Sequence, residues 1–507
     1  MLALLLPVFS VEASYGYELR ILHTNDVHGR LEPIDYHGKE NVGGFAARAK
    51  LIKKIRTEND NVLVLDAGDF AQGTLFYKFF SGIPDIKFMS KAGYDAVELG
   101  NHEFDKGMNS LEKVVDESKI PVLCANIKFL NNPGLQTKIK PYVIKDFKGF
   151  KVAIIGVIAE NLKTLVNNKG GFEVYDVKDT VRDIVSKVDS QADLIIVLSH
   201  IGYDEDIKLA KAVPEIDIIV GGHSHTDLNS PKNIFYNGDR TLILQDGEFG
   251  VQIGDLKLEA DNGEIKNYSY RQVTLDGSKQ DRYFRKKISK LSREIESVSN
   301  QKIGELLTPI DVTKNNPGTG LTKAGTLIVK SIKAKVPEVD IVLQNAGGLR
   351  GSGPVEKSVT KRNVFELYPF ENNIITAEIK GSDLKSIIET SSSRFPSSSD
   401  SFLQSLGLEY SIDTKKPAQI LSEDGLCILK EGKRVSGIKI GGQPLIPDKY
   451  YKVAVNDFVF NGGNGYSQFK NAKNAVNTGI FIQDAIVEFI KKNTPVSVRV
   501  EDRIDLY

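Results

Sequence analysis

The residues whose types could do chemistry are concentrated in one stretch, DAVELGNHEFD at residues 95–105. A short apolar strand there runs directly into an amide and an imidazole, Asn101 and His102. Asp105 follows three residues after His102, so its carboxylate can bend back and bond the far ring nitrogen, which would fix the tautomer. This spacing favours a catalytic or metal site over a polar loop with a stray histidine.

Four other apolar segments end in the same types of residue. Continuous apolar segments are typical of strands buried on both faces of a parallel sheet, and helical patterns, such as those at residues 45–56 and 83–92, separate them. The carboxyl ends of such strands meet at the edge of an α/β sheet where ligands bind. We therefore expect the following side chains to converge: Asp26, His28, Asp69, Asn101, His200, His223 and His225.

This set supplies carboxylate, amide and imidazole ligands, which suit zinc, manganese, cobalt or iron rather than calcium. The residues are too many for one tetrahedral ion, but two divalent ions about 3.5 to 4 Å apart that share a carboxylate fit the number. Asp69 is the expected bridge. Paired ions are typical of hydrolytic phosphatases, in which His102 would stabilise the developing charge or protonate the leaving oxygen. His23 and His37 we interpret as structural.

Composition excludes some other classes of protein. Lysine plus arginine equals aspartate plus glutamate, at 66 each, so no overall field favours a nucleic acid polymer or an anionic membrane as partner. A chain of 507 residues predicts two or three domains. The two cysteines, Cys124 and Cys427, are far apart in the sequence, so we expect no disulfide framework.

The first residues, MLALLLPVFSVEAS, are apolar and then small, with Val11 and Ala13 placed as at a signal-peptidase site. We expect a signal peptide over residues 1–16 and a periplasmic, extracellular or cell-surface location. A truncated start or a retained anchor is the alternative. The apolar run of about ten residues is too short to span a bilayer, and no integral membrane segment is expected in the mature chain.

The rest of the chain divides into three parts. Residues 17–276 carry all the metal-ligand types and form the expected phosphoesterase domain, which two alternating segments complete as antiparallel strands. Residues 277–302 contain a charged helical pattern with little core face, and we expect an interdomain helix there. Residues 303–507 form a second domain with helices predicted near residues 323–335 and 480–492.

The motifs LRILHTNDVHGRLEP, DAGDF, GNHEFD, LSH and GGHSHT together resemble those of the 5'-nucleotidase family of calcineurin-like metallophosphatases, over residues 18–466. The resemblance implies an N-terminal layered α/β/β/α metallophosphatase domain joined by a helix to a C-terminal α+β 5'-nucleotidase domain. It implies His102 and Asp105 as the catalytic dyad. It also implies one ion held by Asp26, His28, Asp69 and His225, and a second held by Asp69, Asn101, His200 and His223.

The resemblance further implies that the C-terminal domain binds a nucleotide and stacks its base between two phenylalanines. NAGGLR resembles the family's N-G-G-G-I-R, so Asn345 would meet the base or sugar and Arg350 the phosphate. YPF and NDFVFNGGNGY match the two aromatic elements, which suggests Phe370 and Phe458. Asn464 occupies the position where the family usually has a ribose-binding aspartate.

Two further departures concern substrate specificity and the choice of metal. GLTKAGTL lacks the arginine that the family usually carries in this context, and His225 replaces a frequent glutamine or asparagine. The sequence predicts an exported dimetal 5'-nucleotidase acting on nucleoside 5'-monophosphates. The alternatives are a nucleotide-sugar hydrolase, a 2',3'-cyclic-nucleotide phosphodiesterase, a sulfur-ester hydrolase of the same superfamily, or a surface binding protein without activity. A monomer and a dimer are both compatible with the sequence.

Overall fold

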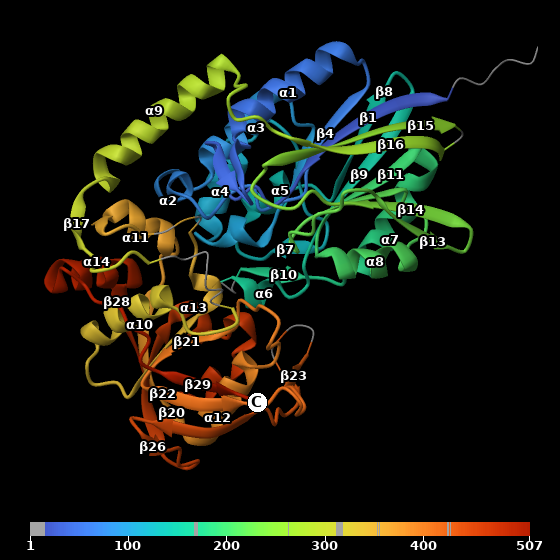
Figure 1. Ribbon diagram of the computed structural model, residues 1–507. Helices are drawn as coiled ribbons and strands as arrows, with labels where there is room; N and C mark the ends of the chain where they lie inside the picture. Colours follow the sequence, from blue (N-terminus) through green and yellow to red (C-terminus); the bar gives the residue numbers. More distant parts are fainter. Residues whose placement is uncertain are drawn as a thin grey trace, which may run out of the picture.

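The computed structural model describes residues 16–507 apart from residues 167–170, 262, 311–317, 352, 354, 423, 424 and 426. The expected signal peptide, all but Gly16, lies outside the described residues. Two units lie one above the other, with the C-terminal unit below in orange and red (Figure 1). Within the described part of the chain, no helix is both long and apolar enough to cross a bilayer.

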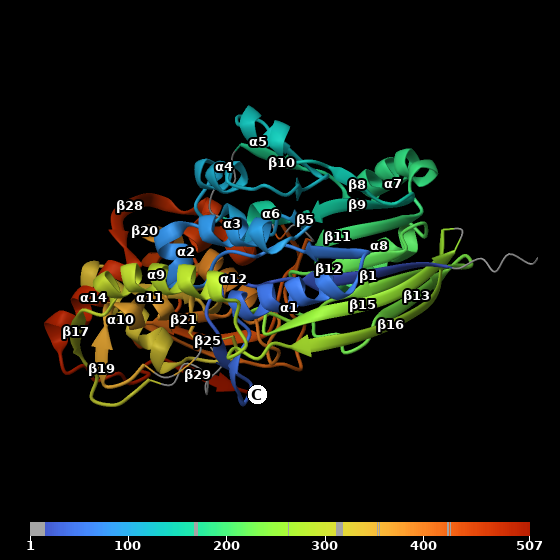
Figure 2. The same cartoon turned by 90° about the horizontal axis from the view of Figure 1, so that it is seen from above.

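The N-terminal unit contains two six-stranded sheets, whose strands lie along broadly the same axis in Figure 2. The first has the order β16-β15-β1-β4-β5-β6, with bounds β1 (Tyr17–Thr24), β4 (Val62–Asp66), β5 (Ala96–Glu98), β6 (Val122–Leu123), β15 (Gln252–Asp261) and β16 (Glu264–Thr274). The second has the order β13-β14-β12-β11-β9-β8, with bounds β8 (Tyr142–Phe147), β9 (Phe150–Ile158), β11 (Leu194–His200), β12 (Ile218–Gly221), β13 (Lys232–Tyr236) and β14 (Asp239–Leu244).

The central strands are parallel, and β15 and β16 complete the first sheet antiparallel to β1, as predicted. Side chains alternate along each strand between two cores. Leu63 and Leu65 of β4 pack between the sheets against residues such as Ile154 of β9, whereas Val62 and Val64 face the outer helices. This alternation explains why the strands read as continuously apolar.

Helices cover the outer face of each sheet. The first sheet is covered by α1 (Phe45–Glu58), α3 (Ile83–Ala92) and α4 (Met108–Asp116). The second is covered by α7 (Val177–Val188) and α8 (Tyr203–Ala212). The layered α/β/β/α architecture is therefore confirmed. Shorter elements connect the layers: β2 (Ile34–Tyr36), β3 (Lys39–Val42), α2 (Leu75–Phe80), a 3-10 turn (Asn101–Phe104), β7 (Ile127–Phe129), α5 (Pro133–Lys138), α6 (Leu162–Leu165) and β10 (Phe172–Val174).

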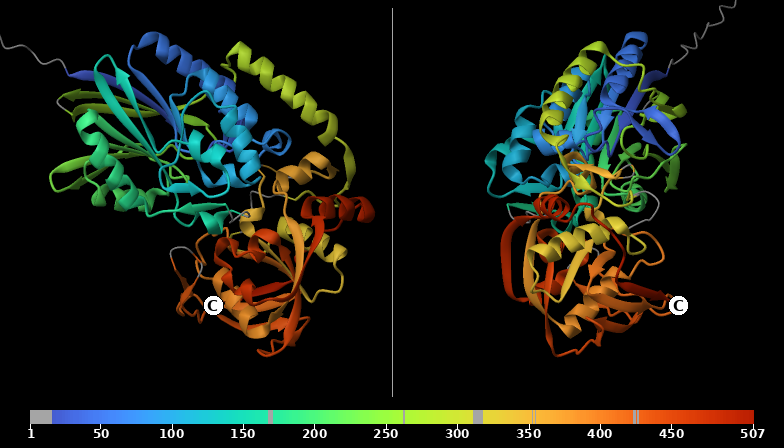
Figure 3. Two further views of the ribbon diagram at one scale, coloured as in Figure 1. Left: turned by 180° about the vertical axis from the view of Figure 1, so that it is seen from behind. Right: turned by 60° about the vertical axis from the view of Figure 1, so that its left-hand side comes forward.

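The predicted interdomain helix is α9 (Arg282–Ser299), which begins where the Asp281 side chain accepts hydrogen bonds from Tyr283 N and Phe284 N at 2.8 and 3.2 Å. The expectation of little core face is wrong. Phe284, Ile288 and Ile295 are buried against the N-terminal core, because they form one narrow stripe among the charges. Figure 3 shows α9 running alongside α1. The domain boundaries at residues 276 and 302 stay a prediction.

The C-terminal unit is α+β, as the resemblance implied. Its main sheet has the order β21-β18-β27-β20-β28, with bounds β18 (Ile341–Asn345), β20 (Asn373–Lys380), β21 (Leu403–Leu406), β27 (Tyr450–Asn456) and β28 (Lys473–Phe481). One face packs on α10 (Lys323–Lys335) and α14 (Ile482–Asn493). The other packs on α12 (Gly381–Ser391) and a smaller sheet that includes β22 (Leu408–Ile412) and β25 (Val435–Ile440). Two short helices, α11 (Lys361–Leu367) and α13 (Asp457–Phe460), lie at the ends of strands.

Shortening a side chain in the core between the two sheets is expected to lower the free energy of unfolding strongly. Ile196 of β11 has no exposed surface. Replacing it with alanine is expected to lower the free energy of unfolding of the N-terminal unit by about 2 to 5 kcal/mol, because a cavity is left where apolar contacts were. Denaturant titration measures the change. Lys257→Ala, on an exposed position of β15, is the control and is expected to change the free energy by less than about 0.5 kcal/mol. Similar values for both variants would contradict the assignment of this core.

Candidate active site

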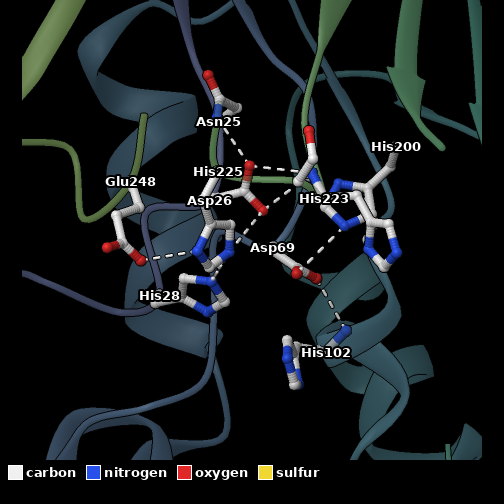
Figure 4. A network of polar contacts seen from close by, with 12 residues as sticks. Asn25, Asp26, His28, Asp69, His102, His200, His223, His225 and Glu248 are labelled. Atoms are coloured by element: carbon white, nitrogen blue, oxygen red, sulfur yellow. Dashed lines mark hydrogen bonds and ion pairs between the residues drawn. The ribbon is translucent and has the colours of Figure 1, made fainter. Parts of the chain in front are cut away.

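The seven predicted ligands lie at the carboxyl ends of β1, β4, β5, β11 and β12, and all of them except Asn101 are labelled in Figure 4. Several of the turns that carry them are backbone outliers. Left-handed φ angles occur at Asp26 (48°), His28 (51°), Asp69 (53°), His223 (72°) and His225 (52°). Such φ angles are uncommon for residues other than glycine and store strain that concentrates at functional sites. The turns are therefore shaped to direct side chains inward.

One half of the cluster is formed by Asp26, His28 and His225, whose potential ligand atoms all lie within 4.8 Å of one another. The two Nε2 atoms of His28 and His225 are 3.1 Å apart, and His225 Nε2 lies 3.4 Å from Asp26 Oδ1. Asp26 is fully buried. Two ring nitrogens and a carboxylate oxygen facing one point form a donor set that suits a divalent cation.

The other half contains Asp69, His200, His223 and Asn101. His200 donates from Nδ1 to the Ala67 carbonyl at 2.7 Å, which directs its Nε2 toward Asp69 Oδ2 at 3.2 Å. Burial opposes the charged ring, but the charge of Asp69 raises the pKa of His200 to about 10. His223 Nδ1 lies 3.0 Å from Asn101 Oδ1. Carboxylate, amide and imidazole groups that converge in a buried site form a donor set that suits a divalent cation, so these residues fit a metal.

Asp69 stands between the two halves, and its bridging role stays a prediction. A carboxylate oxygen of Asp69 lies within 4.8 Å of one from Asp26 and of a His200 ring nitrogen, and also of ring nitrogens of His28 and His102. The backbone N–H of His102 donates to Asp69 Oδ1 at 2.9 Å. The hydrogen bond orients this carboxylate.

His102 and Asp105 form the contact that their spacing suggested. His102 Nδ1 lies 2.8 Å from Asp105 Oδ2, so the opposite ring nitrogen, Nε2, is left for a ligand. Burial opposes the imidazolium, but Asp105 and Asp69 outweigh it and raise the pKa of His102. A histidine oriented in this way can donate a proton to a leaving oxygen or stabilise negative charge beside it.

Three supporting residues were missed by sequence reasoning. The Glu103 carboxylate accepts hydrogen bonds from the backbone N–H groups of Asp69, Ala71 and Gly100 at 3.0, 3.0 and 2.7 Å. Asn25 donates to Asp26 Oδ2 at 2.7 Å. Glu248 lies 2.7 Å from His225 Nδ1. Glu248 follows a strand end, as the ligands do, and that was the available signal.

A cavity of about 1570 Å³ lies between the two units and is lined by both. Its N-terminal wall includes His28, Asp69, Asn101, His102, His223 and His225, whereas Asp26 and His200 lie buried behind this wall. The C-terminal wall includes every residue that the resemblance assigned to the nucleotide: Asn345, Arg350, Phe370, Phe458 and Asn464. The structure thus brings both predicted sets to one space.

On the C-terminal wall, Phe370 lies near the dyad, with its ring centre 6.4 Å from that of His102 and 5.5 Å from Arg350 Cζ. The side-chain oxygen of Asn345 accepts from Gln344 and Asn456 at 3.0 and 2.9 Å. Asn345 also donates to Asn464 Oδ1 at 2.8 Å. The amide of Asn345 is therefore held in one orientation.

Lys78 of α2 connects the two walls. Its ammonium group lies 3.7 Å from Glu371, contacts Gln483 and stands 4.3 Å from the centre of the Phe365 ring. All three partners belong to the C-terminal unit, and Glu371 directly follows Phe370. This contact joins the two walls next to Phe370.

Because Gly100 has no side chain, Asp69 can pack directly against its backbone, and this generates a prediction. A Cβ at Gly100 would lie 2.1 Å from Asp69 Oδ1 and 2.4 Å from Asp69 N. Gly100→Ala is expected to displace the carboxylate and weaken zinc binding by about tenfold or more, measured by titration of the metal-free protein. Gly320→Ala is the control, since among the described residues nothing lies within 4 Å of its added Cβ. Unchanged zinc affinity in Gly100→Ala would contradict a ligand role for Asp69.

Comparisons with known proteins agree with this fold. The family described as calcineurin-like phosphoesterase matches residues 19–227, and the 5'-nucleotidase C-terminal domain matches residues 302–471. The 5'-nucleotidase of Diplobatis ommata is 30% identical, covering 99% of this chain and 92% of its own length. The trifunctional nucleotide phosphoesterase of Bacillus subtilis (strain 168) is 28% identical over 96% of this chain, which spans only 35% of that protein.

Among solved structures, the 5'-nucleotidase precursor from Thermus thermophilus has a TM-score of 0.86 and 29% identity, covering 97% of this chain and 99% of its own. The fold and the donor cluster define a metal-dependent phosphoester hydrolase of the calcineurin-like class. Within that class, the chain belongs to the 5'-nucleotidase family.

Proposed function

We propose that the chain is an exported 5'-nucleotidase that uses two divalent ions to hydrolyse nucleoside 5'-monophosphates to nucleoside and phosphate. The observation that carries the proposal is the shared cavity, which has acids and imidazoles on one wall and phenylalanines, amides and an arginine on the other. A nucleotide would contact both walls. Its anionic phosphate suits the cations that the acids and imidazoles would hold, and the flat faces of its base suit the phenylalanines. Export rests on the sequence of residues 1–16.

The proposed ligands of the first ion are Asp26, His28, Asp69 and His225, and those of the second are Asp69, Asn101, His200 and His223. Zinc, manganese, cobalt and iron fit this donor set. Such ions, when bound, supply the Lewis acidity that ionises water at neutral pH and neutralises phosphate oxygens.

The side chains of the cavity divide the remaining work. His102, oriented by Asp105, donates a proton to the leaving ribose oxygen or stabilises the charge that develops there. Arg350, near both His102 and Phe370, faces the phosphate. Phe370 and Phe458 enclose the base, while Asn345 and Asn464 meet the base or sugar.

A nucleotide-sugar hydrolase or a 2',3'-cyclic-nucleotide phosphodiesterase is the alternative. The size of the cavity is compatible with such larger substrates. Its volume of about 1570 Å³ exceeds the roughly 300 to 1,000 Å³ of most small-molecule pockets. A surface binding protein without activity is less favoured, since binding alone gives no reason for an oriented His102–Asp105 pair.

His102→Ala tests the catalytic proposal. Metal-reconstituted protein is offered AMP, UDP-glucose and 2',3'-cyclic AMP, and phosphate release is measured. The variant is expected to lower kcat on AMP by about 10²- to 10⁴-fold, because a general acid is lost. Lys257→Ala, at the exposed position of β15, is the control and is expected to keep full activity, because Lys257 does not line the cavity. Equal rates for the wild type and His102→Ala would remove the catalytic role.

The two phenylalanines give a separate prediction. Phe370→Ala and Phe458→Ala are each expected to weaken AMP binding by about 1 to 3 kcal/mol through lost stacking. The chemical step should change less, so the measured effect should fall mainly on KM. Phe235→Ala, on an exposed aromatic of β13, is the control. If KM for AMP stays unchanged in both variants, the base lies elsewhere.

A further inference from the structure

Glu248 contacts the metal-ligand cluster although nothing in the sequence motifs assigned it a role. It follows β14, and its Oε2 lies 2.7 Å from Nδ1 of His225. The contact is drawn in Figure 4, where Glu248 approaches His225 from one side and Asp26 lies on the other. The Glu248 side chain is 23% exposed, so the pair lies at the rim of the cavity.

Glu248 is itself held in place. The hydroxyl group of Tyr36, from β2, donates to Glu248 Oε1 at 3.1 Å. The next residue, Phe249, adopts a left-handed φ of 63°, and its backbone N–H donates to the Asp26 carbonyl at 2.8 Å. The Phe249 ring packs edge-on against those of Tyr36 and His28, at 5.8 and 5.9 Å between centres. The carboxylate therefore has one position relative to the cluster.

This position determines what His225 can do. A carboxylate next to Nδ1 accepts its hydrogen, which leaves Nε2 as the ligand atom of the ring. Nε2 lies 3.4 Å from Asp26 Oδ1 and 3.1 Å from His28 Nε2. Without Glu248, the ring of His225 could rotate, because its side chain is 37% exposed.

We propose that Glu248 is a positioning residue that makes His225 a metal ligand, and that the pair biases this half of the cluster toward zinc over manganese. The reason is ligand chemistry: a second imidazole favours zinc, whereas carboxylate, carbonyl and water oxygens suit manganese. The inference rests on the proposed metal-binding role of the cluster but not on the proposed substrate.

The test measures the affinities of the metal-free protein for zinc and for manganese separately, zinc by competition with a chromogenic chelator and manganese by electron paramagnetic resonance. Glu248→Ala is expected to weaken zinc binding by about 10- to 100-fold and manganese binding much less. Glu248→Gln is expected to retain most of the zinc affinity, because its amide oxygen can still accept from Nδ1. An equal loss for both ions would overturn the proposed selectivity.

A second background separates positioning from a structural effect. In the His225→Gln variant, adding Glu248→Ala is expected to cause no further loss of zinc affinity, since the residue acts through the imidazole. The same loss with and without His225 would overturn the proposal. Tyr270→Phe removes a contact of 3.2 Å to His23, a histidine outside the cluster, and is expected to leave both affinities unchanged. Thermal unfolding of the metal-free variants verifies that each is folded.

Activity is measured on the same samples and reports on a different claim. If the wild type prefers zinc through this pair but releases no phosphate from AMP, the proposed nucleotidase function fails and the metal inference stands. If AMP is hydrolysed and Glu248→Ala leaves the zinc affinity unchanged, the inference fails and the function stands.

Discussion

Two buried carboxylates, those of Asp26 and Asp69, set the main constraint on this structure. Each is at most 2% exposed, and a buried carboxylate is unfavourable unless hydrogen bonds or cations compensate it. The backbone N–H of His223 donates to Asp26 at about 3.0 Å, and that of His102 donates to Asp69 at 2.9 Å. Imidazole rings of His200 and His225 lie next to these carboxylates, at 3.2 Å from Asp69 and 3.4 Å from Asp26. The loops after β1, β4, β5 and β12 have the shapes that bring these partners to two acids.

The strain in these loops is balanced by hydrogen bonds between them. The backbone N–H groups of Asp26 and His28 donate to the carbonyls of Gly68 and Asp69 at 3.0 and 2.9 Å, which joins the loop after β1 to the loop after β4. Glu103 then holds the Asp69 loop from the other side. The left-handed φ angles persist because several neighbours fix them together. Such a frame holds ligand atoms before any ion arrives, which favours tight binding.

The sequence could predict that the seven side chains converge because one physical rule applies to every member: each follows an apolar strand, and parallel strands end at one edge. It could not identify Glu103, which resembles an ordinary surface acid until the fold is known. The apolar stripe of α9 was hidden because Phe284, Ile288 and Ile295 are widely spaced among charges. The approach of Phe370 to His102 depends on packing between two separate cores, and no local pattern encodes such packing.

The cavity has walls that belong to different hydrophobic cores, joined through α9 and Lys78. A molecule that touches both walls is therefore linked thermodynamically to the relative position of the cores. Its apparent affinity includes the fraction of molecules in which the walls are correctly spaced. Substitutions where the two units contact each other, far from the bound molecule, would then change the fraction of molecules with correctly spaced walls. They would change how fully the cavity is occupied without altering the chemical step.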